Sequence, residues 1–283
     1  MPNYKITEQD KNILVTNLKD FSLPEILDCG QCFRWQPDEN NIWNGVAFGK
    51  KLSIKQISEN EFLFIGTNLE DFKNIWINYF DLDTDYNKIK NIISSDKIMS
   101  EAVKYAPGIR ILRQESWETL CTFIISQNNN IKRIRGITEK LCKEFGEEVD
   151  GIYTFPTAER LAKLTLEELE PLKSGFRAKY ILDAAQKVSD GTVNLDEISK
   201  MSYEDAKNYL RQIKGVGPKV ADCTLLFGFY RLEAFPEDVW IKRAMKTFYP
   251  EGLPENLLEY RGIAQQYLFH YARTKEDSFE NVK

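Results

Sequence analysis

A lysine and an aspartate on either side of an apolar helical segment are the residues of this chain best suited to chemistry. Lys219 directly follows the turn Gly215-Val-Gly-Pro218, and Asp238 lies beyond the apolar segment that comes after it. A neutral amine can attack carbon, and a carboxylate can stabilise positive charge that develops nearby. The pair therefore suggests nucleophilic attack on an electrophilic carbon.

The turn before Lys219 joins two apolar helical patterns and is a candidate phosphate site. Gly215 and Gly217 allow positive φ and close approach, and Pro218 suits the first position of the second helix. The unpaired N–H groups and the dipole at a helix N-terminus favour an anion, and the same dipole disfavours the protonated form of the Lys219 amine. Taken alone, the turn is equally typical of a DNA-binding module and of an enzyme.

Asp238 follows Pro236 closely and immediately precedes a helical pattern of apolar residues. An aspartate at such a position is most often only an N-cap, because its side chain accepts a backbone N–H of the first turn. Lysine and aspartate on either side of one apolar helix are nevertheless an uncommon combination. We therefore interpret Asp238 as a predicted N-cap and also as a candidate catalytic carboxylate.

The elements that must position these residues change in character near residue 95. Before it, short alternating segments predict an antiparallel meander, with strands at 31–35, 42–48, 52–57 and 62–65 and then a helix over 69–79. After it the periodicity is helical. Ser116 and Ser202 are predicted N-caps, Thr165–Glu168 a capping box, Gly175 a helix stop, and 255–273 the last helix. The predicted fold class is α+β, with an antiparallel β domain in 1–97, a helical core in 98–273 and a charged tail in 274–283.

The composition is that of a globular protein, with 42% hydrophobic and 29% charged residues. Neither a membrane span nor a signal peptide is predicted. Five scattered cysteines suit a reducing cytosol, and Cys29-Gly-Gln-Cys32 lacks the second pair that a zinc site needs, so these two are predicted to be structural. The net charge of −5 by itself disfavours DNA binding, but the local clustering of basic residues matters more.

Six blocks, in order along about 26–36 and 109–273, resemble the eukaryotic-type 8-oxoguanine DNA glycosylase/AP lyase family. They are CGQCFRW, LRQESWETLCTFIISQNNNIKRIRG, SGFRAKYI, GVGPKVADC, FPEDV and AQQYLF. The resemblance implies a TATA-binding-protein-like β domain followed by a helix-hairpin-helix-GPD core. It implies a base-excision-repair enzyme that flips 8-oxoguanine out of the duplex, excises it opposite cytosine, and nicks the abasic site by β-elimination. Lys219 matches the nucleophile that forms the Schiff base, and Asp238 matches the catalytic aspartate.

The resemblance also assigns a base pocket. Gly30 matches the residue whose carbonyl accepts the hydrogen that 8-oxoguanine carries at N7, where guanine has only an acceptor. Gln265 matches the amide that reads the Watson–Crick edge, and Phe269 matches the ring that stacks on the base. These two are four residues apart on the predicted last helix and so share a face. Cys223 matches the residue on the other face of the base.

On the DNA-facing side, Asn128 resembles the residue that fills the space left by the flipped base. Arg133 and Arg177 resemble the readers of the orphaned cytosine, which suits the guanidinium fork. Phe176 stands where the family often has a tyrosine wedge. Gly215 and Gly217 complete the predicted DNA-binding set.

Two departures from the family pattern lie beside the catalytic pair. Trp240 stands where a histidine is common, and Ala272 stands where its acidic partner is usual. Both members of this pair are replaced, so the phosphate contact that the resemblance assigns to the histidine, and its support by the acidic partner, are expected to differ in this chain. The only histidine, His270, is predicted to be structural.

Alternatives stay open within the same superfamily. An endonuclease III-type enzyme would carry clustered cysteines after the hairpin, but none follows Cys223, so no iron–sulfur cluster and no metal site are predicted. A monofunctional glycosylase for another damaged base would keep Asp238 without Lys219, and a non-catalytic DNA-binding protein would need neither. No cofactor is required, while a structural cation at the hairpin turn is left open. The predicted partner is double-stranded DNA containing 8-oxoguanine, bound by a monomer in the cytoplasm at a prokaryotic nucleoid.

Overall fold

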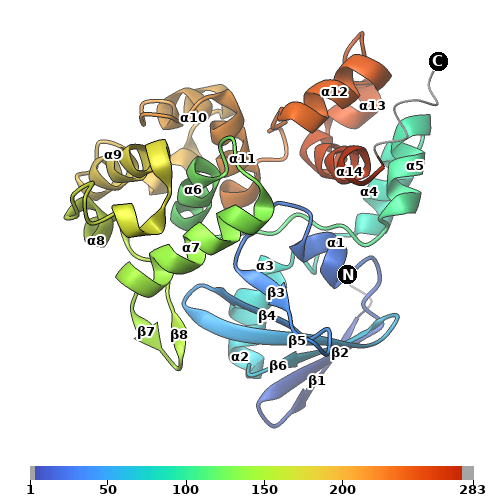
Figure 1. Cartoon of the computed structure of the whole chain (residues 1–283). Coiled ribbons are helices and arrows are strands. Elements are labelled where there is room, and N and C mark those ends of the chain that lie inside the picture. Colours follow the sequence, from blue (N-terminus) through green and yellow to red (C-terminus); the bar gives the residue numbers. More distant parts are fainter. Residues whose placement is uncertain (1–3, 276–283) are drawn as a thin grey trace. The chain divides into compact units, whose positions relative to one another are not determined.

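The computed structural model describes residues 4–275, which form two compact units. The first unit consists of the chain up to Gln31, Ile54–Arg113 and the chain from Tyr230 onward. The second unit consists of Cys32–Ser53 and Gln114–Phe229. The chain therefore leaves the first unit twice and returns to it twice (Figure 1).

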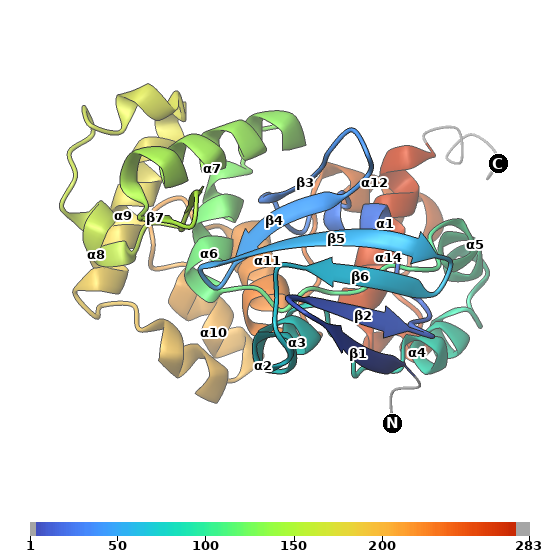
Figure 2. The same ribbon diagram turned by 90° about the horizontal axis from the view of Figure 1, so that it is seen from below.

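Six strands form an antiparallel sheet in the order β1-β2-β6-β5-β4-β3. Strand β2 lies beside β6 (Figure 2). Ile13 and Val15 of β2 pair with Phe64 and Phe62 of β6, and all four side chains are buried because alternate residues of a strand face the same side. The strands are β1 (Lys5–Gln9), β2 (Asn12–Thr16), β3 (Trp35–Pro37), β4 (Trp43–Ala47), β5 (Lys50–Ser58) and β6 (Glu61–Ile65).

The prediction of a strand at 31–35 is wrong, since only its last residue, Trp35, belongs to a strand. The Gln31 side chain is the physical reason. Its amide donates to the carbonyls of Ile26 and Arg110, and its oxygen accepts the N–H of Leu112, so this segment is held as a loop. The predicted strands at 42–48, 52–57 and 62–65 are confirmed, whereas β1 and β2 were not predicted.

The first unit contains helices in each of its three chain segments. The predicted helix over 69–79 is confirmed as one helical run that contains a π-helical turn, η1. The prediction of one last helix is wrong: it breaks before Arg261, because the N–H of Gly262 donates to the carbonyl of Leu232 instead of continuing the ladder. The helices are α1 (Leu23–Leu27), α2 (Leu69–Asp71), η1 (Phe72–Trp76), α3 (Ile77–Tyr79), α4 (Tyr86–Ile93), α5 (Lys97–Tyr105), α12 (Val239–Phe248), α13 (Glu255–Leu258) and α14 (Arg261–Thr274).

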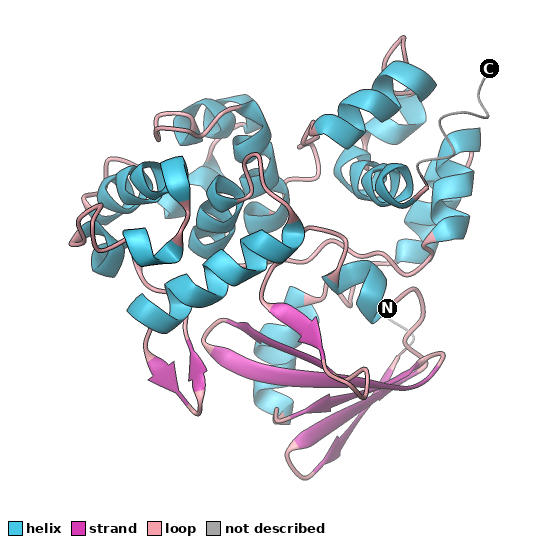
Figure 3. Cartoon of the chain, viewed as in Figure 1, coloured by secondary structure: helices cyan, strands magenta, loops and turns pink. Residues whose placement is uncertain are grey.

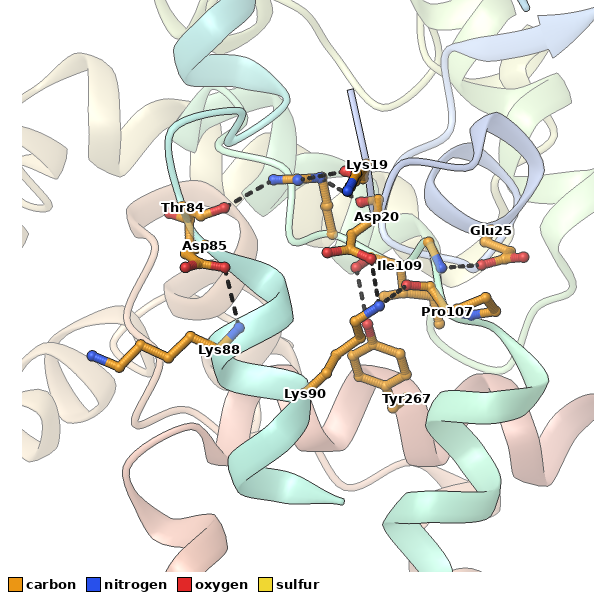
Figure 4. Close-up of polar contacts among 12 residues, drawn as sticks. Lys19, Asp20, Glu25, Thr84, Asp85, Lys88, Lys90, Pro107, Ile109 and Tyr267 are labelled. Atoms are coloured by element: carbon orange, nitrogen blue, oxygen red, sulfur yellow. Dashed lines mark hydrogen bonds and ion pairs between the residues drawn. The ribbon is translucent and has the colours of Figure 1, made fainter. Parts of the chain in front are cut away.

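Buried polar contacts fix the loops of this unit. Lys90 pairs with Asp20 at 2.5 Å and donates to the carbonyl of Pro107 (Figure 4). The Arg110 guanidinium is almost fully buried, and such a charge is tolerated only when its donors are paired. It donates to the carbonyls of Lys19, Asp20, Asp81 and Thr84.

The second unit is mainly helical and carries a small hairpin of strands β7 (Glu148–Val149) and β8 (Ile152–Tyr153) (Figure 3). Helix α6 packs along α11, and Gly228 permits this approach, because a β-carbon there would lie 3.1 Å from the Ser116 Cα. The helices are α6 (Ser116–Ile125), α7 (Ile131–Phe145), α8 (Ala158–Ala162), η2 (Glu170–Leu172), η3 (Gly175–Arg177), α9 (Ala178–Ser189), η4 (Leu195–Lys200), α10 (Tyr203–Leu210) and α11 (Pro218–Phe229).

Local capping predictions have mixed outcomes. Ser202 caps α10 as predicted, and Thr165–Glu168 forms both bonds of a capping box, at 2.8 and 3.3 Å. Ser116 is not an N-cap but the first helical residue; the N-cap is Glu115, whose carboxylate accepts a distant backbone N–H instead. Gly175 has φ of +61° but opens η3 rather than ending a helix, because η2 already ends at Leu172.

Among residues 4–275, no helix combines the length and apolar character needed to cross a membrane. All five cysteines are buried and none is in a disulfide within the described chain, and the Cys29 thiol donates to the carbonyl of Ile26. The predicted charged tail lies outside the described residues apart from its first two. The predicted domain boundary at residue 97 stays a prediction.

Candidate functional site

The Lys219 amine lies at the start of α11 and contacts residues of α6 and its end. Nζ donates to Oγ of Ser126 at 3.1 Å and lies 5.0 Å from the centroid of the Phe123 ring. The side chain is half-buried, and within residues 4–275 it forms no ion pair with a carboxylate. The amine therefore faces a hydroxyl and an aromatic ring rather than a counter-ion, which leaves it available for reaction.

The hairpin before Lys219 uses its two glycines differently. Gly215 has φ of +80°, and a β-carbon there would lie 2.3 Å from the Tyr180 ring, so only glycine fits. Gly217 does not take a positive φ. This residue instead caps α11, since its carbonyl accepts the N–H of Ala221 at 3.0 Å. Nothing lies within 4 Å of where its β-carbon would be, so the helix N-terminus is open to a ligand.

Asp238 is the N-cap of α12, as predicted. Its carboxylate accepts the N–H of Ile241 at 2.8 Å, and the residue is half-buried. An N-cap carboxylate is fixed in direction by this bond. The geometry thus holds one oxygen in place, while the catalytic role of Asp238 stays a prediction.

Three of the predicted pocket residues come together in the first unit. Gly30, with φ of +83°, lies against Phe269: a β-carbon on Gly30 would be 3.3 Å from Cε1 of that ring. Gln265 precedes Phe269 by one turn of α14 and is 4% exposed. Its Nε2 donates to the carbonyl of Pro236 at 3.1 Å, but its buried Oε1 has no donor among the described residues. Such a buried unpaired acceptor needs an explanation, and a ligand is one.

The loop that contains Gly30 is held by the last helix. Arg273 donates to the carbonyl of Asp28 at 3.0 Å, and Gln266 donates to the carbonyl of Cys29 at 2.9 Å. The next carbonyl, that of Gly30, accepts no hydrogen bond from the part of the chain that the structure describes. It is therefore free to accept one from a ligand.

The predicted DNA-facing residues Asn128, Arg133 and Arg177 also come together, in the second unit. Arg177 is buried and donates to the carbonyls of Gln127, Asn128 and Ser174. Burial, and then the nearby Arg133 charge, lower the pKa of the Arg177 guanidinium. Arg133 itself is exposed. Reading of a base by Arg177 would therefore require it to exchange some of these backbone bonds.

The wedge candidate Phe176 is 45% exposed, with the Arg177 guanidinium 4.5 Å from its ring centroid. Asn128 is exposed and has φ of +46°. An exposed aromatic ring and an exposed amide in a left-handed turn are suited to contact with a nucleic acid.

The remaining candidates, Cys223, Trp240, Ala272 and His270, lie on helices α11, α12 and α14. Cys223 is one turn beyond Lys219 on α11 and is buried. Trp240 is half-buried on α12, and Ala272 is fully buried on α14. The His270 ring lies 5.8 Å from that of Tyr105, and burial followed by the Arg273 charge lowers its pKa, which fits a structural role.

Two family models together cover most of the chain. The 8-oxoguanine DNA glycosylase N-terminal domain matches residues 13–120, and the HhH-GPD superfamily base excision DNA repair protein matches residues 121–254. The N-glycosylase/DNA lyase of Saccharomyces cerevisiae is 36% identical over 277 residues, which cover 87% of this chain and 73% of the yeast protein. The chain belongs to the 8-oxoguanine DNA glycosylase/AP lyase family. It is therefore an enzyme, a DNA N-glycosylase and DNA lyase, rather than a non-catalytic DNA-binding protein.

Solved structures of this glycosylase family match the whole fold. MBOgg1, in complex with a low-affinity DNA ligand, is 41% identical with a TM-score of 0.91, covering 97% of this chain and 99% of that one. The Clostridium acetobutylicum 8-oxoguanine glycosylase/lyase, in complex with double-stranded DNA containing cytosine opposite 8-oxoguanine, is 38% identical with a TM-score of 0.90, covering 98% and 100%.

Four residues that contact the candidate site of this glycosylase were not predicted: Phe123, Ser126, Gln266 and Arg273. Each contacts a residue far away in sequence. Phe123, Ser126 and Gln266 lie inside the segments that resemble the family, which was the one available signal, and Arg273 lies outside them.

Within residues 4–275, no group of three or more His, Cys, Asp or Glu side chains is placed to hold a metal ion. This observation does not bear on the structural cation that the sequence leaves open at the hairpin turn.

Proposed function

We propose that this glycosylase excises 8-oxoguanine paired with cytosine and then nicks the abasic site by β-elimination through a Schiff base on Lys219. The environment of Lys219 carries the proposal: its amine is half-buried, beside a hydroxyl and a ring, and in no ion pair within the described chain. The Clostridium relative bound to DNA with cytosine opposite 8-oxoguanine supports the choice of base pair.

The chemistry begins with the neutral Lys219 amine attacking C1′ of the flipped nucleotide. The bond from C1′ to N9 breaks, and the base leaves with the electron pair and is protonated. Asp238 stabilises the positive charge that grows on the sugar as the base departs. The sugar ring then opens to an iminium ion, a proton leaves C2′, and the 3′ phosphate is expelled.

Recognition of the base is assigned mainly to residues of the first unit, with Cys223 of the second unit as the exception. The Gly30 carbonyl accepts the hydrogen at N7 of 8-oxoguanine, and Phe269 stacks on the ring. The Watson–Crick edge of guanine presents N–H donors, and the unpaired Gln265 Oε1 is a matching acceptor. Cys223 is assigned to the opposite face of the base. One such hydrogen bond is worth about 1–3 kcal/mol, so several are needed for strong discrimination.

The opposite strand is assigned to the second unit, with Asn128 filling the vacated stack and Arg133 and Arg177 reading the cytosine. Phe176 wedges the duplex, and the N–H groups that follow Gly215 and Gly217 hold a phosphate. We further propose a cytoplasmic monomer at the nucleoid that needs no cofactor. Its DNA affinity should fall steeply with salt despite the net charge of −5, because phosphate contacts release counter-ions.

Excision of 8-oxoguanine placed opposite each of the four bases tests this proposal. Single-turnover rates should be highest opposite cytosine, and product strands should be nicked without added base or heat. Equal rates opposite all four bases would remove the cytosine assignment. Base release without nicking would favour the monofunctional alternative.

A further inference from the structure

We propose that Arg273 is a positioning residue for base recognition, which together with Gln266 fixes the Gly30 carbonyl beside Phe269. The inference deepens the proposed function and rests on it. Arg273 does not contact the reacting atoms in this account; it acts through the loop Asp28–Gly30.

Helix α14 holds this loop at two successive carbonyls. Gln266 donates to the Cys29 carbonyl at 2.9 Å, and Arg273 donates to the Asp28 carbonyl at 3.0 Å. Gln266 lies three residues before Phe269 and Arg273 four residues after it, so all three project from one face of the helix. The stacking ring is therefore flanked by two side chains that both bind the Gly30 loop.

Arg273 also fills the space where the loop meets the ring. Its Nη1 lies 3.7 Å from the position that a β-carbon on Gly30 would occupy, and its Cζ lies 5.6 Å from the centroid of the Phe269 ring. Nη1 is buried and has no acceptor among the described residues. A charged group with an unused buried donor is costly to keep in a protein, so a purely structural reason for an arginine here is weak.

The residues on either side of Gly30 are fixed from different directions. On the C-terminal side, Gln31 is bound to the carbonyls of Ile26 and Arg110 and to the N–H of Leu112. On the N-terminal side, Gln266 and Arg273 supply the bonds. The bonds of Gln31 on one side and those of Gln266 and Arg273 on the other thus set the direction of the Gly30 carbonyl. A group that recognises a ligand must be held in place by supporting bonds of this kind.

The test compares two activities of the full-length protein carrying Arg273→Leu. The first is single-turnover excision of 8-oxoguanine opposite cytosine, and the second is nicking of a preformed abasic site in the same duplex. An abasic site has no base to recognise, so loss of the loop support should slow excision about 10- to 100-fold while nicking changes less than about threefold.

Arg261→Leu is the matched control, because Arg261 begins the helix whose last turn carries Arg273 and also donates to a backbone carbonyl, that of Glu233. Both activities of this variant should remain close to wild type. If Arg273→Leu does not fold, Arg273→Lys keeps the charge while losing the guanidinium geometry, and it should show a smaller loss with the same selectivity for excision.

Equal losses of excision and nicking in the Arg273 variants would overturn the inference, because they would indicate a general structural defect. Unchanged excision would overturn it as well. A wild-type protein that nicks abasic DNA but does not excise 8-oxoguanine would instead refute the proposed function, on which the inference rests.

Discussion

The Phe269 ring lies against Gly30, so closely that a β-carbon on Gly30 would be 3.3 Å from Cε1 of the ring. The backbone of Gly30 also has φ of +83°, a region that side chains other than glycine rarely adopt. Space and backbone conformation therefore both exclude a larger residue. This contact joins the N-terminal loop to the last helix where the proposal places the damaged base.

Gly30→Ala should slow excision of 8-oxoguanine at least about tenfold, because the added methyl group displaces Phe269 and turns the carbonyl. The strained φ should lower the free energy of unfolding by about 1–3 kcal/mol. Excision kinetics and urea unfolding measure the two effects, and abasic-site nicking is the internal control. Wild-type excision by a folded Gly30→Ala protein would contradict the assignment of Gly30.

Gln265→Met should separate activity from stability. The variant loses the bond to the Pro236 carbonyl but also removes a buried acceptor that has no donor within residues 4–275. These two effects oppose one another, so the free energy of unfolding should change by less than about 1 kcal/mol, while excision falls by tens-fold. Thermal unfolding and single-turnover kinetics check this. A large stability loss with unchanged excision would make Gln265 a core residue instead.

The buried pair Arg34–Glu118, 3.2 Å apart, should make stability depend on pH. Burial raises the pKa of Glu118 to about 7; Arg34 opposes this rise and Glu115 adds to it. Because the folded-state pKa lies above the ordinary value of 4.5, the folded protein binds the proton more tightly than the unfolded chain does. The stabilisation is therefore complete below about pH 4.5 and is lost as the pH rises through about 7.

Glu118→Gln removes this titration while keeping an acceptor for Arg34. Relative to the variant, the wild type should lose about 1–3 kcal/mol of unfolding free energy between pH 5 and pH 8. Urea unfolding at several pH values measures the difference. Parallel profiles for the two proteins would show that Glu118 does not titrate in this range.

Asp81 should be among the most sensitive positions of the first unit outside the pocket. Its buried carboxylate accepts from Arg113 at 2.7 Å, from Tyr230 at 2.7 Å and from Tyr86 at 3.0 Å. Thr84 donates to it as well, at 2.8 Å, so Asp81→Ala removes the acceptor of a guanidinium and three hydroxyls and should lower the unfolding free energy by about 3–5 kcal/mol. Asp81→Asn keeps acceptors and should cost clearly less. Equal losses for the two variants, measured in urea, would speak against this account.

What the sequence predicts well is local. Ser202 caps its helix, Thr165–Glu168 forms its capping box, and Lys219 lies in the first turn of α11, because these features depend on residues within one helical turn. The family resemblance adds the roles of site residues that are far apart in the sequence, which local patterns do not indicate.

What the sequence does not predict depends on distant partners. The break before Arg261 follows from a bond between the N–H of Gly262 and the carbonyl of Leu232. The bond between Lys219 and Ser126 joins residues 93 positions apart. Periodicity and capping rules do not reach such pairs, which is why the residues that support the site were missed.

Borohydride trapping on duplex DNA with 8-oxoguanine opposite cytosine tests the central claim most directly, because reduction makes a lysine Schiff base permanent. The account predicts a covalent protein–DNA adduct with the wild type and none with Lys219→Gln, although that variant should still bind the lesion duplex. Efficient base release by the wild type without a trappable adduct, or an undiminished adduct with Lys219→Gln, would contradict it.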